Sequence, residues 1–382
     1  MRIASRDEVA KSPHWQKAFA HERKDHRYYE LVEDTLKDGF TYGYFAIEID
    51  GAVCAIQPYF IVDQDLLAGT GGHITKLIAW LRRFWPRFMC SRMLMVGCAA
   101  GEGHLDGDLA SQGATAELFA RDLPRLAREL NCAMVALKEF PAECRPALQC
   151  LRQGGFTRIP SMPMTTLAID YKNFDDYVSK ALSPHTRGKI RRKLRASERA
   201  QPGITMTVVN DVTAVIDTIY PLYEKVFERS TLKFEKLTKD FLCQIGRRIP
   251  DKARFFIWRQ DTTIIAFGLC MVQADGIWSE YVGFDYAVAY TLSLYHRVFH
   301  DTVEWAIGKG YKRFYSTSLN YDPKWHLRQS LYPIDLYVRH TSAPINALLK
   351  RLLPLLEPTR SDKILPNFHN YGDLWGEPRR HQ

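Results

Sequence analysis

The 382-residue sequence lacks several features that would place it in a special class of proteins. No apolar run approaches the roughly 18–20 residues that a membrane-spanning helix needs, and the first residues contain no apolar signal core. Low-complexity segments are also missing. These absences predict a cytoplasmic protein without stable membrane insertion, and they leave the oligomeric state open.

The eight cysteines form neither a CxxC pair nor a Cys/His cluster with the spacing of a zinc site. Several stand inside apolar runs, as Cys270 does, so we expect free and mostly buried thiols of a reducing compartment. His296 and His300 share a helix face at i+4 spacing. An HxxxH pair without a third ligand does not indicate a metal site, and no metal is predicted.

The composition is that of a globular chain, with 46% hydrophobic and 25% charged residues, and its length suits two domains. The formal net charge of +9 predicts attraction to polyanions. Nucleic acid, a phosphorylated cofactor and an anionic membrane all fit this charge, and the value does not discriminate among them.

The predicted elements occur in the same order in both halves of the chain. In the first half, strands on either side of Asp50-Gly51 form a hairpin. The strands, helix and further strands that follow cover 92–98, 114–130, 133–140 and 164–170. The second half repeats the order over 212–227, 253–260, 262–273, 276–286, 294–310, 313–318 and 334–340. The tripeptide Leu-Arg-Gln also recurs, at 151–153 and 327–329. We therefore predict a duplicated α/β (α+β) unit, each copy a mixed, mostly antiparallel sheet flanked by helices.

A basic helix at 183–200, begun by Ser183-Pro184, marks the predicted boundary between domains 1–182 and 183–358. The tail 359–382 is polar, and we expect it to pack loosely. The helix carries arginines at i+4 spacing, namely Arg187, Arg191, Arg195 and Arg199. Their face is either solvated or paired with acids, or it contacts the phosphates of a transfer RNA or of coenzyme A.

Three segments carry a resemblance to known proteins: SPHTRGKIRRKLRASE (183–198), YVGFDYAVAYTLSLYHRVFHDTVEWAIGKGYKRF (281–314) and YDPKWHLRQSLYPIDLYVRH (321–340). The chain resembles the Fem-like acyltransferases with tandem acetyltransferase (GNAT) domains. The resemblance implies that a bound amine directly attacks an activated acyl carbonyl. Such a reaction needs a base, donors for the carbonyl oxygen and an acid for the leaving group.

The resemblance also implies roles for particular residues. A splayed strand at 279–283 would supply backbone N–H donors and hold the donor molecule at Tyr281, Val282 and Gly283. Glu280 is the first candidate for the general base and Asp285 the second, Tyr321 is the candidate acid, and Lys324 would neutralise a phosphate or carboxylate. The ordinary alternatives are a salt-bridged or exposed glutamate, a core tyrosine and a hydrated lysine.

The expected function is transfer of an acyl group from acyl-coenzyme A to a small or amino-acid-like amine. One departure counts against coenzyme A: GNAT proteins cradle its pyrophosphate with a glycine-rich loop, whereas 286–292 here has no glycine. The first half does have Gly101-Glu102-Gly103 after its strand. Aminoacyl-tRNA as the donor, and a non-catalytic binding protein, remain the alternatives.

Two further segments suggest other functions. The segment 93–105 looks like the glycine loop of a methyltransferase but lacks the acid and the glycine of that motif. The segment 77–89 mixes aromatic residues with arginines and could line an acyl tunnel, contact a membrane or pack on the sheet.

Overall fold

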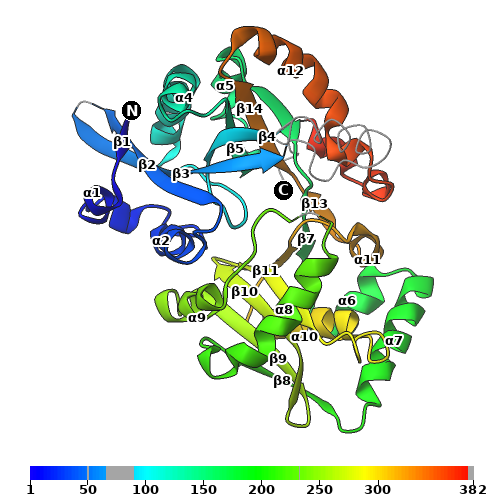
Figure 1. Cartoon of the computed structure of the whole chain (residues 1–382). Coiled ribbons are helices and arrows are strands. Elements are labelled where there is room, and N and C mark those ends of the chain that lie inside the picture. The colour runs from blue at the N-terminus through cyan, green and yellow to red at the C-terminus, as the bar shows by residue number, and fades with distance from the viewer. Residues whose placement is uncertain (50, 66–89, 232, 377–382) are drawn as a thin grey trace, which may run out of the picture.

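The computed structural model describes residues 1–49, 51–65, 90–231 and 233–376. It contains two seven-stranded sheets, one above the other in the view of Figure 1. The segment 77–89 lies outside the described residues. Within them, no helix is both long and apolar enough to cross a membrane.

The first sheet is formed mainly by the N-terminal half. Its strands, in spatial order, are β1 (Arg2–Ala4), β2 (Phe40–Ile49), β3 (Ala52–Asp65), β4 (Cys90–Val96), β5 (Met134–Pro141), β14 (Ile334–His340) and β6 (Thr157–Pro160). The helices of this half are α1 (Arg6–Ala10), α2 (His26–Thr35), α4 (Leu109–Glu129) and α5 (Gln149–Gln153). The expected hairpin pairs Ile49 with Ala52, next to Gly51 at a φ of 79°, a conformation that favours glycine.

The second sheet is formed mainly by the C-terminal half. Its strands, in order, are β13 (Ser330–Tyr332), β7 (Met164–Ala168), β12 (Arg313–Ser316), β11 (Gly276–Phe284), β10 (Thr263–Gln273), β9 (Ala253–Gln260) and β8 (Ile204–Val209). The helices around it are α6 (Phe174–Ala181), α7 (Pro184–Glu198), α8 (Ile216–Arg229), α9 (Lys239–Arg248), α10 (Leu294–Gly308) and α11 (Tyr321–His326). A further helix, α12 (Ala343–Leu356), follows β14 and lies at the edge of the molecule (Figure 1).

The two sheets are built on the same plan. Each has one parallel pair among the described strands, β4–β5 in the first and β11–β12 in the second, and all other pairs are antiparallel. In each case the long helix α4 or α10 connects the two parallel strands. The predicted pair of mixed, mostly antiparallel sheets is confirmed.

The sheets exchange strands, which the sequence pattern did not indicate. Strand β14 of the second half inserts between β5 and β6, and β7 of the first half inserts between β12 and β13. No single cut in the chain therefore separates the two sheets. The domain boundary between residues 182 and 183 stays a prediction.

The halves also share a hydrophobic core. One cluster of buried side chains joins Tyr28 and Phe60 of the first half to Leu222, Phe241 and Leu269 of the second. Burial of a continuous apolar surface stabilises the contact between the sheets as it stabilises each sheet itself.

The C-terminal tail packs tightly as far as residue 376, contrary to expectation. Leu365, Phe368 and Leu374 are buried against Tyr321 and its neighbours. The guanidinium of Arg145 donates hydrogen bonds to backbone carbonyls of the tail, including that of Leu374 at 3.1 Å. The segment is polar on average, so its composition did not indicate that these few apolar residues would be buried.

A buried ion pair fixes the exchanged strand β14. Asp335 is fully buried and accepts hydrogen bonds from Arg145 Nε at 2.6 Å and from Arg158 Nη1 at 3.3 Å. We predict that Asp335→Ala lowers the free energy of unfolding by about 3–5 kcal/mol, because it leaves two arginines without their carboxylate. Urea denaturation measures this change. The exposed Asp170→Ala serves as control, and an equally small effect of both substitutions would contradict the assignment.

Candidate active site

Strands β11 and β12 part in the middle of the second sheet. Their parallel pairing covers only Gly276–Ser279 against Arg313–Ser316. Beyond Ser279, β11 continues to Phe284 while it pairs with β10 alone. The edge of β11 that faces away from β10 thus has no β12 partner over its last five residues.

A β-bulge lies where the two strands part. Leu269 of β10 pairs with Tyr281, and the next residue, Cys270, pairs with Ser279. Glu280 is therefore the extra residue of β11. Bulges interrupt the ladder and redirect side chains, and they are frequent beside active sites. The geometry agrees with the expected splayed strand at 279–283.

The side chain of Glu280 is buried in an ion cluster between the two halves of the chain. Its Oε1 accepts a hydrogen bond from Arg23 Nε at 2.6 Å, and its Oε2 lies 3.6 Å from Lys24 Nζ. Glu102 of the first half pairs with the same two cations, at 2.7 Å from Lys24 Nζ. All four side chains are at least nine-tenths buried. The structure thus gives Glu280 the salt-bridged environment of the ordinary alternative, and its role as general base stays a prediction.

Two further contacts with second-half residues hold Arg23 against the second sheet. Its backbone N–H donates to Gln273 Oε1 at 3.0 Å, and its guanidinium lies over the ring of Trp278, 4.7 Å from the centroid. Gly101 leaves the space that Lys24 occupies, since a Cβ there would lie 1.9 Å from Lys24 Nζ. The sequence did not indicate that Arg23 and Lys24 contribute to the site. The glycines on either side of Glu102 were the one local sign that another group packs closely there.

Lys324 lies at the point where the strands part. Its Nζ donates a hydrogen bond to the carbonyl of Thr317, the residue after the last β11–β12 pair. The side chain is buried, so the expectation of a hydrated lysine is wrong. Burial lowers the pKa of Lys324 to about 7.

Tyr321, the predicted acid, is a buried tyrosine of the same helix. Its hydroxyl donates to the carbonyl of Pro163 at 2.8 Å, and burial raises its pKa. This is the hydrogen-bonded core tyrosine of the ordinary alternative.

The remaining predicted residues of β11 have packing partners. At Gly283 a Cβ would lie 2.7 Å from the backbone nitrogen of Tyr223, so the glycine lets helix α8 lie directly on the strand. The hydroxyl of Tyr281 donates to Glu235 at 2.9 Å, and burial raises the tyrosine's pKa. Val282 packs against the other face, in the core under α10.

The loop before α10 is closed by its own hydrogen bonds. The carboxylate of Asp285 accepts the N–H of Ala287 at 3.2 Å and lies 3.7 Å from Lys225 Nζ. The backbone N–H groups of residues 288, 289, 292, 293 and 294 donate to carbonyls of the same loop. Few N–H groups are left to bind a pyrophosphate.

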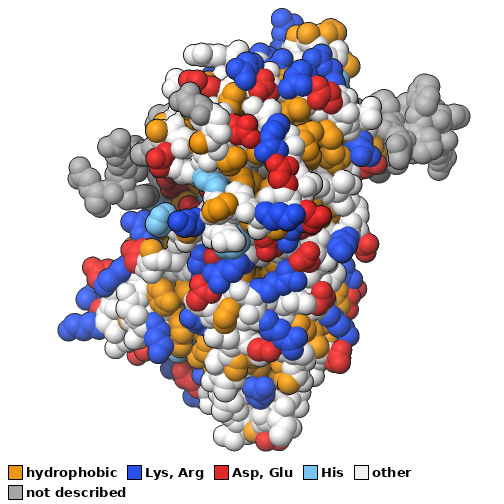
Figure 2. All heavy atoms as spheres, turned by 90° about the vertical axis from the view of Figure 1, so that its left-hand side faces the viewer, with side chains coloured by type: hydrophobic (Ala, Val, Ile, Leu, Met, Phe, Trp, Pro, Cys, Tyr) orange, Lys and Arg blue, Asp and Glu red, His pale blue; other side chains and the backbone are white. Residues whose placement is uncertain are grey.

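The arginines of α7 divide into two groups. Arg187 donates to the carbonyl of Ser179 at 2.6 Å, in the last turn of α6. Arg191 and Arg195 are exposed, and no carboxylate of the described residues lies within salt-bridge distance of them. On the face shown in Figure 2, by contrast, cationic and anionic side chains are interspersed.

The two histidines of α10 have ordinary partners. His296 Nε2 lies 3.1 Å from Lys193 Nζ, and burial and that charge lower its pKa to about 4. His300 contacts Asp301. The cysteines are free, three of them buried, whereas Cys90 is exposed.

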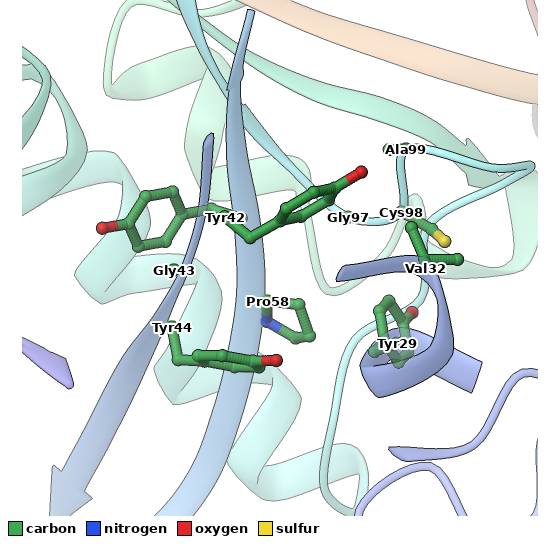
Figure 3. Close-up of a pocket in the computed structure, with 10 residues that line it drawn as sticks. Tyr29, Val32, Tyr42, Gly43, Tyr44, Pro58, Gly97, Cys98 and Ala99 are labelled. Carbon is green, nitrogen blue, oxygen red and sulfur yellow. The ribbon is translucent and has the colours of Figure 1, made fainter. Parts of the chain in front are cut away.

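The first half contains a small cavity of about 10 Å³, enough for one water molecule. Tyr29 and Val32 of α2 line one side of it, opposite Tyr42 and Tyr44 of β2 (Figure 3). The turn Gly97–Ala99, from the methyltransferase-like segment, closes it. Its size excludes a nucleoside or an acyl donor.

Comparison with known proteins agrees with this geometry. Residues 184–322 match the family model of the acetyltransferase (GNAT) domain. Among proteins with curated descriptions, none matches the sequence. Among solved structures, FemX aligns with a TM-score of 0.54 and 13% identity, over 92% of this chain and 99% of FemX. L-PGS from Bacillus licheniformis aligns with a TM-score of 0.50 and 14% identity, over 85% and 95% of the two chains.

These identities support conclusions about the fold alone. The resemblance to Fem-like proteins with tandem GNAT domains is confirmed at that level: residues 184–322 match the GNAT family model, and the chain shares the overall fold of FemX.

Proposed function

We propose that the protein transfers an acyl group from acyl-coenzyme A to the amine of a small or amino-acid-like acceptor, where β11 parts from β12. One observation carries this proposal. Strand β11 is bulged and has a free edge beyond its last pair with β12, and Thr317, the residue after that pair, accepts a hydrogen bond from the buried Lys324, whose pKa is about 7. A GNAT domain supports acyl transfer in general, and the reaction needs these two kinds of group.

The free edge of β11 is suited to hold the acyl carbonyl. Backbone N–H groups beyond Ser279 that point away from β10 have no β12 strand to bind, so they can donate to the oxygen that becomes negative during attack. The amine nitrogen forms a bond to the carbonyl carbon, and the bond from that carbon to the thioester sulfur then breaks.

Lys324 is the group we assign to proton transfer. A pKa near 7 leaves both protonation states populated at neutral pH, so the neutral amine can accept the acceptor's proton and the ammonium can protonate the leaving thiolate. Glu280 is less suited to be the base, because a carboxylate paired with Arg23 and Lys24 would lose those contacts when it accepted a proton.

The first test measures release of free coenzyme A from acetyl-coenzyme A in the presence of a mixture of amino acids and polyamines. We expect Lys324→Met to lower the rate by roughly 10²–10⁴, and the wild-type rate to change with pH around 7. The exposed Lys309→Met is the control. Loss of activity in Tyr321→Phe, with Lys324→Met active, would transfer the role to the tyrosine. Binding of coenzyme A without turnover by any variant would favour the non-catalytic alternative.

Lys324 should also make stability depend on pH. Its folded pKa of about 7 lies below the value of 10.5 for a free lysine, so the unfolded chain binds more protons between these limits. We predict that the wild type gains up to about 1.4 kcal/mol of stability per pH unit relative to Lys324→Met as the pH rises from 7 towards 10. Urea midpoints at pH 7, 8 and 9 check this, and a constant difference would contradict the buried lysine.

Aminoacyl-tRNA is the second candidate donor, and a separate observation favours it. The loop before α10 has used most of its N–H groups internally, whereas Arg191 and Arg195 of α7 are exposed without acidic partners. Polyphosphate recognition by arginine side chains is sequence-independent and suits a tRNA.

Charge reversal distinguishes the two donors. If tRNA is the donor, Arg191→Glu/Arg195→Glu should weaken tRNA binding and reduce the slope of log K against log salt by about 2. The control Arg128→Glu/Arg152→Glu makes the same change of charge at exposed residues of the first half. Equal effects of both double variants, or binding of coenzyme A but not of tRNA, would remove this candidate.

A further inference from the structure

Helix α12 exposes a stripe of large apolar side chains. Ile345, Leu348, Leu352 and Leu355 have exposed fractions of 45%, 57%, 39% and 78%. They make up four of the eight large apolar side chains that are strongly exposed among the described residues. Concentration of such side chains on one element marks an interaction site more often than scattered exposure does.

The stripe is distinct from the face with which α12 packs on the protein. At 100° per residue, the four side chains fall within an arc of roughly 80°. Leu349 and Leu353, on the neighbouring arc, pack against the core shared by the two halves. A helix needs one apolar face to cover its own sheet, so the outward stripe is surplus to folding.

The surroundings of the stripe are cationic. From Thr341 to Leu356 the sequence contains no aspartate or glutamate, but it contains Lys350 and Arg351, both exposed. Arg351 follows Leu348 by three residues and precedes Leu355 by four, so it lies alongside the stripe. Its stem can cover apolar surface while the guanidinium reaches a phosphate.

We propose that α12 binds flat to the surface of an anionic lipid bilayer. The four apolar side chains enter the boundary between headgroups and acyl chains, and Arg351 pairs with a lipid phosphate. Fourteen residues span only about 21 Å, which is too short to cross the bilayer.

A second copy of the chain is a poorer occupant of the stripe. In a two-fold dimer each residue meets the same surface patch of the partner, so Arg351 would approach another cationic helix that offers no carboxylate. A bilayer that contains phosphatidylglycerol supplies the missing negative charge together with the apolar phase.

The test is co-sedimentation of the full chain with vesicles of phosphatidylcholine alone, or of phosphatidylcholine with phosphatidylglycerol. We expect binding to the anionic vesicles that weakens with salt, and at least about tenfold weaker binding of Leu348→Glu/Leu355→Glu. The control Ile49→Glu/Val209→Glu changes exposed apolar residues far from α12 by the same charge and should bind within about twofold of wild type. Arg351→Gln should reduce the salt dependence without affecting the fold.

Three results would overturn the proposal. The first is no binding of the wild type to anionic vesicles. The second is an equal loss in the two double variants, which would indicate a general effect of charge. The third is a wild-type dimer in sedimentation equilibrium that Leu348→Glu/Leu355→Glu converts to a monomer, since the stripe would then be an interface between copies. Circular dichroism verifies that each variant is folded.

Discussion

The ion cluster of Arg23, Lys24, Glu102 and Glu280 is the constraint on which the candidate site depends. Burial of a single charge costs far more than an average domain can offset, so each of the four groups needs the others in place. Burial opposes ionisation of Glu102, but the charges of Arg23 and Lys24 outweigh it and hold its pKa well below the usual value. Three members come from the first half, and the fourth is the bulged residue of β11. The bulge thus keeps its position only when both halves of the chain are assembled.

The strand exchange strengthens this dependence. Because β7 lies inside the second sheet and β14 inside the first, each sheet is completed by residues of the other half. The segment 184–322, which matches the GNAT family model, does not contain β7. That strand pairs with β12 through Arg313–Ser316, directly before the point where β12 and β11 part. The position of Ser316 therefore depends on a strand outside the matched segment. The geometry of the parted strands is a property of the whole chain and not of one GNAT unit.

Local sequence signals predicted much of the fold, but they did not predict the contacts between residues far apart in the sequence. Ser183-Pro184 predicted the start of α7 because a capping serine and a proline act within one turn, and Ser183 does accept the N–H of Thr186. The sequence could not predict which sheet the strands at 164–168 and 334–340 join, because an apolar strand can pair in either sheet. The ion pair of Asp335 with Arg145, which fixes β14, forms only in the folded protein. The parting of β11 at 279–283 was expected. The partner of Glu280 could not be predicted, because Arg23 lies 257 residues away in the sequence. The role of Lys324 stays a prediction, and its burial depends on tertiary packing that hydrophobic periodicity does not report.

The closed loop before α10 bears on which donor the site accepts. In a glycine-rich loop the backbone turns its N–H groups outward, and a pyrophosphate replaces water as their acceptor. Here Asp285 accepts the N–H of Ala287 and a helical turn uses the next ones, so a diphosphate would compete with bonds already made and would meet a carboxylate. Ser293 begins α10 with a φ of 51° and no side-chain cap. Under the proposed acyl transfer, side chains would have to match most of the donor's negative charge, and the exposed arginines of α7 are candidates for that role. The proposed acyl transfer at β11 is therefore compatible with recognition of the donor by an element other than this loop.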